Sequence, residues 1–382
     1  DIAHIQRYLE WKRINEIFPV NVTGIVTSRD NLAIDFEKNS LKNKIMMFRN
    51  ENLPDEIIRE GLKLKDNYQW KLSEQRKIFQ KVDNWGQYFT EILYRPFDIR
   101  HIYYQDNIVF RTRREVMRHM LEKNIGIVTS RQTQSNFKHV FISDKIIEFN
   151  LTGTAGRYGS GYLFPLYLYP EQSKKDNPGR NLTTMLIFEP GEKYGRKPNI
   201  ATIIFSRLAE HYPKRPSPEE IFYYVYAILY SNIYRETYVE FLKIDFPRVP
   251  FTADYEVFKN LGKSGKQLAD LHLLRSPALD PPIARYQGSS PNDRIEKVIY
   301  QKDEQRIYIN NDKYFEGIAP EVWNYYIGGY QVLHKYLKDR KGRTMDDAPH
   351  YCRIVTALSK TIEIQKQIDA IYPDVEKEII KF

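Results

Sequence analysis

Residues 171–199 divide the chain into halves with different hydrophobic patterns, and this division constrains the fold more than any single motif. The segment is rich in glycine, proline and charged residues, so we predict a linker or insertion there. Before it, short β-branched and aromatic runs lie between polar turns, which is typical of strands. After it, longer apolar runs recur at helical spacing. The sequence therefore predicts a mixed α/β (α+β) chain with a β-rich first half and a mainly helical second half.

Four parts are expected along the chain: a helical connection at 1–20, a β-rich subdomain at 21–170, the linker at 171–199, and a mainly helical subdomain at 200–382. In the first half, β-branched and aromatic runs predict strands at 21–27, 32–36, 125–129, 139–143 and 163–169, with a turn at 28–31. Polar-faced helices are expected at 41–62 and 72–82, and an amphipathic helix at 111–123.

The clearest local signal in the second half is a helix start. Ser217 can cap the helix, Pro218 suits its first turn, and Glu220 can complete a capping box. The apolar run that follows should be buried, and Ser231-Asn232 should bend or split the helix. Further helices are expected at 254–274, loosely broken at Gly262 and Gly265, and at 320–337 and 348–371, with a hairpin from 295–300 and 306–309.

Charge and cysteine content narrow the functional classes. The chain has 58 Lys and Arg against 49 Asp and Glu, a formal net charge of +9, which favours a polyanionic partner. No stretch approaches the roughly 20 apolar residues of a membrane helix, so no membrane partner is expected. The single cysteine, Cys352, excludes an intramolecular disulfide and a cysteine-based zinc cluster. We expect a cytoplasmic protein, with Cys352 as a small buried residue.

No catalytic motif is complete. Asp280-Pro281-Pro282-Ile283 half-matches the motif with which amino-methyltransferases hold a flipped base, but isoleucine has no ring to stack on it. Gly262-Lys263-Ser264 echoes a P-loop end, but Val257 stands where the loop needs glycine. We therefore predict no catalytic residue, cofactor site or metal site in this chain, with a degenerate methyltransferase as an alternative. Because the first residue is Asp1 rather than Met, we expect a fragment of a longer protein.

Basic and amide side chains gather in segments suited to nucleic acid. Arginine forks fit phosphates and guanine edges, and Gln or Asn fits adenine. The candidate DNA-binding residues are Arg29, Arg95, Arg100, Arg111, Arg113 and Arg114, then Ser130, Arg131, Gln132, Gln134 and Asn136, and finally Lys338, Lys341 and Arg343. Each group has a plainer alternative: a solvated basic helix face, an ordinary hairpin loop, and favourable charge at a helix C-terminus.

Several sequence segments resemble those of a known family: Gly24 to Asp30, Tyr94 to Asp98, Phe164 to Pro170, Phe241 to Pro250, Gly328 to Leu333 and Lys338 to Arg343. The set resembles the C-terminal target-recognition (specificity) region of type ISP single-polypeptide restriction–modification enzymes. Those enzymes join a nuclease, an ATP-dependent translocase with helicase motifs, and an adenine methyltransferase to this region.

The resemblance implies that the chain binds double-stranded DNA sequence-specifically and directs catalytic domains that lie upstream. Residues 1–20 would then connect to the upstream methyltransferase domain, which is the second expected partner. S-adenosylmethionine, ATP and Mg would be bound by the upstream domains, and the chain by itself would not be an enzyme. The alternative is a structural module that couples enzyme domains and reads few bases.

Overall fold

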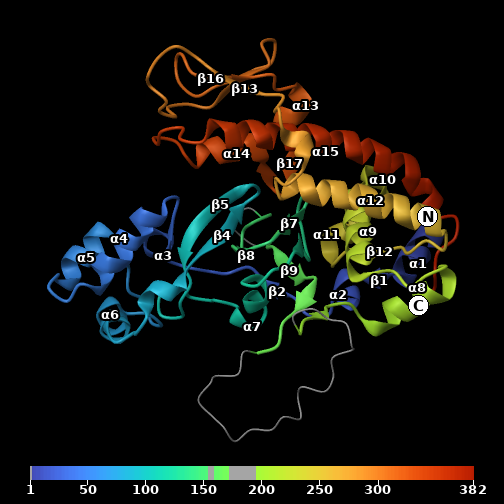
Figure 1. Cartoon of the computed structure of the whole chain (residues 1–382), viewed down its shortest axis with the longest axis horizontal. Helices are drawn as coiled ribbons and strands as arrows, with labels where there is room; N and C mark the ends of the chain where they lie inside the picture. Colours follow the sequence, from blue (N-terminus) through green and yellow to red (C-terminus); the bar gives the residue numbers. More distant parts are fainter. Residues whose placement is uncertain (1, 154–158, 172–194) are drawn as a thin grey trace, which may run out of the picture.

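The computed structural model describes residues 2–153, 159–171 and 195–382. Most of the predicted linker lies outside these residues. In Figure 1 a lobe of helices α4 (Lys38–Arg49), α5 (Asp55–Gly61) and α6 (Leu72–Gln80) lies at one end, and the strands of the first half lie in the middle. The helices of the second half occupy the other end and extend over the strands. The expected mixed α/β class is confirmed.

Two small sheets build the first half. One has the order β2 (Val22–Thr23), β9 (Tyr162–Pro165), β6 (Gly126–Thr129) and β7 (Val140–Ser143), with every pair antiparallel. The other has the order β3 (Ile34–Asp35), β5 (Asp98–Tyr103), β4 (Phe89–Arg95) and β8 (Ile146–Ile147), with β8 parallel to β4. Residues of β6, β7 and β8 are all buried, which explains why these runs are apolar rather than alternating.

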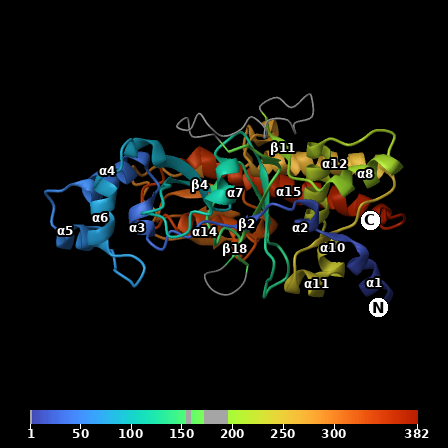
Figure 2. The same ribbon diagram turned by 90° about the horizontal axis from the view of Figure 1, so that it is seen from below.

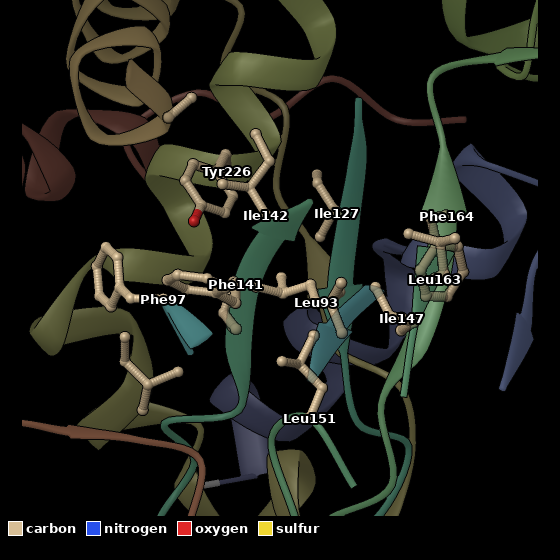
Figure 3. Packing of buried hydrophobic residues seen from close by; sticks show 14 of the residues in the cluster. Leu93, Phe97, Ile127, Phe141, Ile142, Ile147, Leu151, Leu163, Phe164 and Tyr226 are labelled. Carbon is tan, nitrogen blue, oxygen red and sulfur yellow. The ribbon is translucent and has the colours of Figure 1, made fainter. Parts of the chain in front are cut away.

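One hydrophobic core joins both sheets to the helices. Figure 3 shows side chains from β4, β6, β7 and β9 gathered with Tyr226 of α9 (Pro218–Tyr230). His272 links the strands to α9. The centre of its ring lies 5.3 Å from that of Phe141, on which it stacks, and its Nδ1 lies 2.7 Å from the Tyr226 hydroxyl oxygen. Burial lowers the pKa of His272 to about 3, so the imidazole is neutral.

The helical half begins as its sequence predicts. Glu220 donates its backbone N–H to the Ser217 hydroxyl at 3.1 Å, and Ser217 donates its own to the Glu220 carboxylate at 2.7 Å, so the capping box is confirmed. Ser231 then ends α9 and caps α10 (Asn232–Thr237). The remaining helices of this layer are α8 (Thr202–His211), α11 (Val239–Ile244), α12 (Tyr255–His272) and α15 (Ala348–Val375).

The predicted break in α12 is wrong, and the reason lies in helix packing. The helix runs unbroken through Gly262 and Gly265. A Cβ on Gly265 would lie only 1.8 Å from the carbonyl oxygen of Tyr223 on α9. Gly265 therefore lets the backbones of α9 and α12 approach closely, and it does not loosen the helix.

The predicted continuous helix at 320–337 is also wrong. The chain forms α13 (Pro320–Trp323), a hairpin of β17 (Tyr326–Ile327) and β18 (Tyr330–Gln331), and α14 (Val332–Lys338). Gly328 at the hairpin turn has φ +58°, and a Cβ there would lie 1.7 Å from the Thr152 carbonyl oxygen. Only glycine fits this turn, because a side chain would strain the backbone and collide with residue 152.

Other elements differ in detail from the expected ones. The expected turn and strand at 28–36 become α3 (Asp30–Ala33) followed by β3, and the expected helix at 111–123 shortens to α7 (Arg114–Met117) and the 3₁₀ turn Arg118–Met120. The first 20 residues form α1 (Ile2–Glu10), β1 (Lys12–Arg13) and α2 (Ile14–Ile17), and β1 pairs with β12 (Arg248–Val249). β10 (Tyr167–Leu168) pairs with β11 (Lys197–Pro198).

The predicted hairpin near residue 300 is part of a larger sheet. Its strands β14 (Ile299–Gln301) and β15 (Arg306–Tyr308) are joined by β16 (Tyr314–Glu316) and β13 (Arg285–Gln287). The 3₁₀ turns Trp85–Tyr88 and Pro277–Leu279 complete the short elements. Within the described ranges, no helix has the length and apolar character needed to span a bilayer.

Gly265→Ala should destabilise the chain, whereas Gly262→Ala should not. A Cβ at Gly265 meets backbone at 1.8 Å, and such overpacking costs about 1–3 kcal/mol. A Cβ at Gly262 meets its nearest heavy atom at an ordinary 3.8 Å, so alanine should stabilise the helix by roughly 0.5–1 kcal/mol. Free energies of unfolding from urea titrations measure both changes. Equal effects of the two substitutions would contradict the packing described for α9 and α12.

Candidate nucleic-acid interface

The polar run between β6 and β7, residues 130–138, is here called the reading loop. Its backbone is fixed at three points by segments distant in sequence. Thr133 donates its N–H to Lys243 O at 3.1 Å, Gly159 donates to Gln132 O at 2.8 Å, and Gly328 donates to Lys138 O at 2.7 Å. The loop is therefore held between α11 and the β17–β18 turn. Figure 2 shows α11 and β18 on the same lower edge of the molecule.

Most predicted side chains of the reading loop face solvent. Gln134 and Asn136 are exposed, and neither amide has a hydrogen-bond partner in the described part of the chain. Arg131 is also exposed, with 57% of its side chain accessible, and it pairs with Asp245 at 3.1 Å. Gln132 donates to the Ile244 carbonyl at 3.3 Å. The loop thus presents an arginine and three amides from a fixed backbone.

Ser130 is the exception in the reading loop. It is fully buried, and its hydroxyl lies 3.2 Å from that of Thr152. This corrects the expectation that Ser130 faces DNA, since the hydroxyl is used inside the molecule. Lys138, which sequence reasoning missed, is exposed, and its ammonium lies 5.5 Å from the ring centre of Tyr326 in β17. Its position in the polar run before β7 was the available signal.

The basic and aromatic cluster at 94–100 is largely internal. Arg95 is paired with Glu148, and its guanidinium lies 4.1 Å from the centre of the Tyr94 ring. Arg100 binds Asp98 at 2.8 Å and approaches Asp339 at 3.6 Å. These two arginines are committed to neighbouring carboxylates, which corrects the expectation that they present free guanidinium groups to DNA.

Asp98 is the centre of the internal network. It is 1% exposed, and its other carboxylate oxygen accepts from Arg340 at 2.7 Å. Burial would raise the pKa of Asp98, but the charges and hydrogen bonds of Arg100 and Arg340 outweigh it, so the pKa is lowered. The group is therefore an ionised carboxylate that ties β5 to the end of α14. Sequence reasoning missed Arg340 in this role.

The basic turn after α14 retains free cations. Lys338 and Lys341 are exposed, and neither makes an ion pair with any described residue. Arg343 approaches Glu37 at 3.6 Å and lies 4.5 Å from the centre of the Phe36 ring. Two of the three predicted residues in this turn can thus meet an anion without first losing a carboxylate partner.

The fold brings together Arg29 and Arg111, which are far apart in sequence. A backbone bridge between Val26 and Arg111 places both arginines on the wall of one open depression. Lys63 and Lys65 line an adjoining depression that also includes Arg29. We call this combined surface the Arg29 basin: Arg29, Lys63, Lys65, Asn67, Gln69 and Arg111.

Arg113 and Arg114 lie nearby in sequence and are half-buried. The Nε of Arg113 is buried without a hydrogen-bond partner, and Arg114 lies 3.8 Å from Asp106 and 4.8 Å from the Tyr104 ring centre. The side chains of both arginines are therefore partly accessible to solvent. The sequence did not single out Lys63 and Lys65, because the fold alone places them beside Arg29.

The described part of the chain offers few side chains suited to catalysis. Among the residues whose positions are described, no group of three or more His, Cys, Asp or Glu side chains could hold a metal ion. Cys352 is buried, as expected, and burial raises the pKa of its thiol to about 11. Its sulfur is therefore protonated at neutral pH. What the surface does offer is cationic and amide hydrogen-bond donors.

Comparison with solved structures finds the same fold in three DNA complexes. A nuclease-deletion mutant of the type ISP restriction-modification enzyme LlaGI, in complex with a DNA substrate mimic, is 21% identical with a TM-score of 0.65 and aligns over 95% of this chain. The ATP-dependent type ISP enzyme LlaBIII bound to DNA is 23% identical with a TM-score of 0.67, and a DrdV–DNA complex is 20% identical with a TM-score of 0.67, each over 92% of this chain.

This chain corresponds to only a fraction of those molecules: 29%, 24% and 36% of the respective chains. A search of curated proteins found no match. The model of the type ISP C-terminal specificity domain, however, matches residues 16–367, which is nearly the whole sequence. The resemblance seen in the sequence is thereby confirmed, and the chain belongs to the type ISP C-terminal specificity domain family.

Proposed function

We propose that this chain is the target-recognition region of a type ISP restriction–modification enzyme and binds double-stranded DNA sequence-specifically. Family membership supports this function, as do the DNA complexes of the structural relatives. The observation that carries the proposal is the reading loop, which holds an arginine and several amides in solvent on a backbone fixed at three points. A fixed loop loses little conformational entropy when it binds.

Base reading by this loop has a favourable energy balance. Gln134 and Asn136 have no side-chain hydrogen bonds to other described residues, and an amide pairs bidentately with adenine. Arg131 would exchange Asp245 for a guanine edge. An exposed ion pair of this kind contributes about 0–1 kcal/mol, whereas a bidentate base contact discriminates by about 1–3 kcal/mol. Loss of the ion pair is therefore a small cost beside the discrimination that a correct base contact provides.

Phosphate contacts would supply affinity that does not depend on sequence. Lys338 and Lys341 are exposed and unpaired among the described residues, so they can replace counterions on the DNA backbone. Arg95 and Arg100 would instead support the surface from within, because their carboxylate partners already occupy them. Of the residues that the sequence indicated, only a subset is thus proposed to touch DNA.

In this proposal the chain carries no chemistry of its own. An adenine-N6 methyltransferase and an ATP-dependent translocase and nuclease elsewhere in a longer cytoplasmic protein would bind S-adenosylmethionine, ATP and Mg. The methyltransferase would flip the adenine that this region selects. A coupling module with little base reading is the second candidate. The internal network of Asp98, Arg100 and Arg340 favours it, because that network gives structural rigidity without facing DNA.

Gln134→Ala and Asn136→Ala should each weaken binding to the preferred duplex by about 1–3 kcal/mol and relax its sequence preference. The preferred sequence would first be selected with the wild-type chain from a randomised duplex library. Fluorescence anisotropy on this duplex and on a scrambled one gives the two affinities. Ser135→Ala, in the same exposed loop, is the matched control and should change neither. Losses of equal size on both duplexes would exclude base reading by these amides.

Lys341→Ala should lower affinity equally for all sequences. Removing one phosphate contact reduces the slope of log K against log salt concentration by about 0.9. Titration with NaCl on the preferred and scrambled duplexes measures this slope. An unchanged slope would show that Lys341 lies away from the DNA.

A further inference from the structure

Arg29 lies at the floor of the Arg29 basin. The residue is only 7% exposed, yet its guanidinium makes no ion pair or hydrogen bond with any described residue, and its Nε is buried and unsatisfied. The guanidinium lies over the face of Trp70, whose ring centre is 4.1 Å away. Burial lowers the pKa of Arg29 to about 10, so the guanidinium stays charged at neutral pH. An unpaired buried cation is costly unless a ligand supplies the anion.

The Trp70 contact fixes the guanidinium in place. Trp70 is itself buried and donates its indole N–H to Asn107 O at 3.0 Å. A guanidinium stacked on a fixed ring keeps its edge N–H groups available for an acceptor in the plane of the fork. Arg29 borders both open depressions, so such an acceptor would enter from solvent.

The other cations of the basin are also unpaired. Lys63, Lys65 and Arg111 are exposed, and none of them makes an ion pair within the described ranges. Three separate segments therefore direct positive charge at one surface. Convergent, unpaired cations on an exposed surface form the electrostatic footprint expected for a polyanion.

Most acidic side chains that line the two depressions form ion pairs with arginines that lie outside the depressions. Asp66 pairs with Arg59 at 3.0 Å, Glu148 pairs with Arg95, and Asp106 lies 3.8 Å from Arg114. Asp30 is the remaining carboxylate, and it accepts hydrogen bonds from the hydroxyls of Tyr94 and Thr27. Among the described residues, the two depressions thus hold four basin cations and one carboxylate without a cationic partner.

The rim of the basin is a rigid turn. The Asn67 side-chain oxygen accepts from the backbone N–H groups of Gln69 and Trp70, both at 2.9 Å. Asp66 holds the next residues by accepting from Leu72 N at 2.9 Å. Tyr68 at the tip of the turn is 89% exposed. A tyrosine ring held in solvent beside free cations is placed to pack against a sugar or base.

We propose that the Arg29 basin binds a stretch of the DNA phosphodiester backbone, with Arg29 donating to phosphates from its floor and Lys63, Lys65 and Arg111 from its rim. The inference rests on the proposed DNA-binding function and adds a second contact region remote in sequence from the reading loop. It is a positioning contact, because phosphates carry no direct sequence information. The basin would fix the register of the duplex while the loop reads bases.

The test is the salt dependence of DNA binding by the full 382-residue chain. Lys65→Ala, Arg111→Ala and Arg29→Gln should each lower the slope of log K against log salt concentration by about 0.9. Each should weaken binding to preferred and scrambled duplexes by the same factor. Lys42→Ala on α4 is the matched control, because Lys42 is exposed, makes no ion pair among the described residues and lines neither depression. Its slope should equal that of the wild type.

The outcomes separate this inference from the function on which it rests. If Lys65→Ala and Arg111→Ala keep the wild-type slope while the wild type binds DNA, the basin is not a phosphate site. If the wild type shows no salt-dependent binding, the DNA-binding function itself fails. Arg29 is buried, so thermal unfolding must first show that Arg29→Gln is folded. The two exposed positions decide the question even if that variant does not fold.

Discussion

The proposed reading surface depends most on the backbone contacts that fix the reading loop. A loop of polar residues would ordinarily be mobile, because its side chains gain little from burial. Here the backbone at Gln132, Thr133 and Lys138 is bonded to Gly159, α11 and the β17–β18 turn. The turn can approach only because Gly328 has no side chain. The β17–β18 turn, which belongs to the second half of the sequence, thus fixes the backbone of a loop in the first half. The two halves therefore both contribute to the position of the reading loop.

A second constraint is that buried carboxylates of this chain are paired with arginines. Asp98 is ionised in the interior and needs both Arg100 and Arg340, while Glu148 needs Arg95. Removing one partner of such a buried pair is strongly destabilising, because it leaves an uncompensated charge. These arginines therefore join segments of the chain, and net charge alone overstates the cationic surface available to a partner. Within the candidate interface, the unpaired cations among the described residues include those of the Arg29 basin and of the turn after α14.

Short-range patterns in the sequence predicted the elements that local chemistry determines. The capping box at Ser217 and Glu220 and the apolar strands β6 and β7 are examples. The sequence could not show that Gly265 serves helix packing or that Gly328 makes a turn, because both depend on a distant backbone. For the same reason Lys63 and Lys65 were not associated with Arg29. Buried carboxylate partners for Arg95 and Arg100 likewise became visible only in three dimensions.

The most direct test of sequence reading by the loop is a binding selection with and without it. Randomised duplexes would be selected by the wild-type chain and by a chain whose residues 131–136 are replaced with an equal length of glycine and serine. The wild type should enrich one sequence motif, and the replaced chain should enrich none while still binding DNA in low salt. Enrichment of the same motif by both chains would show that bases are read elsewhere and would contradict the account.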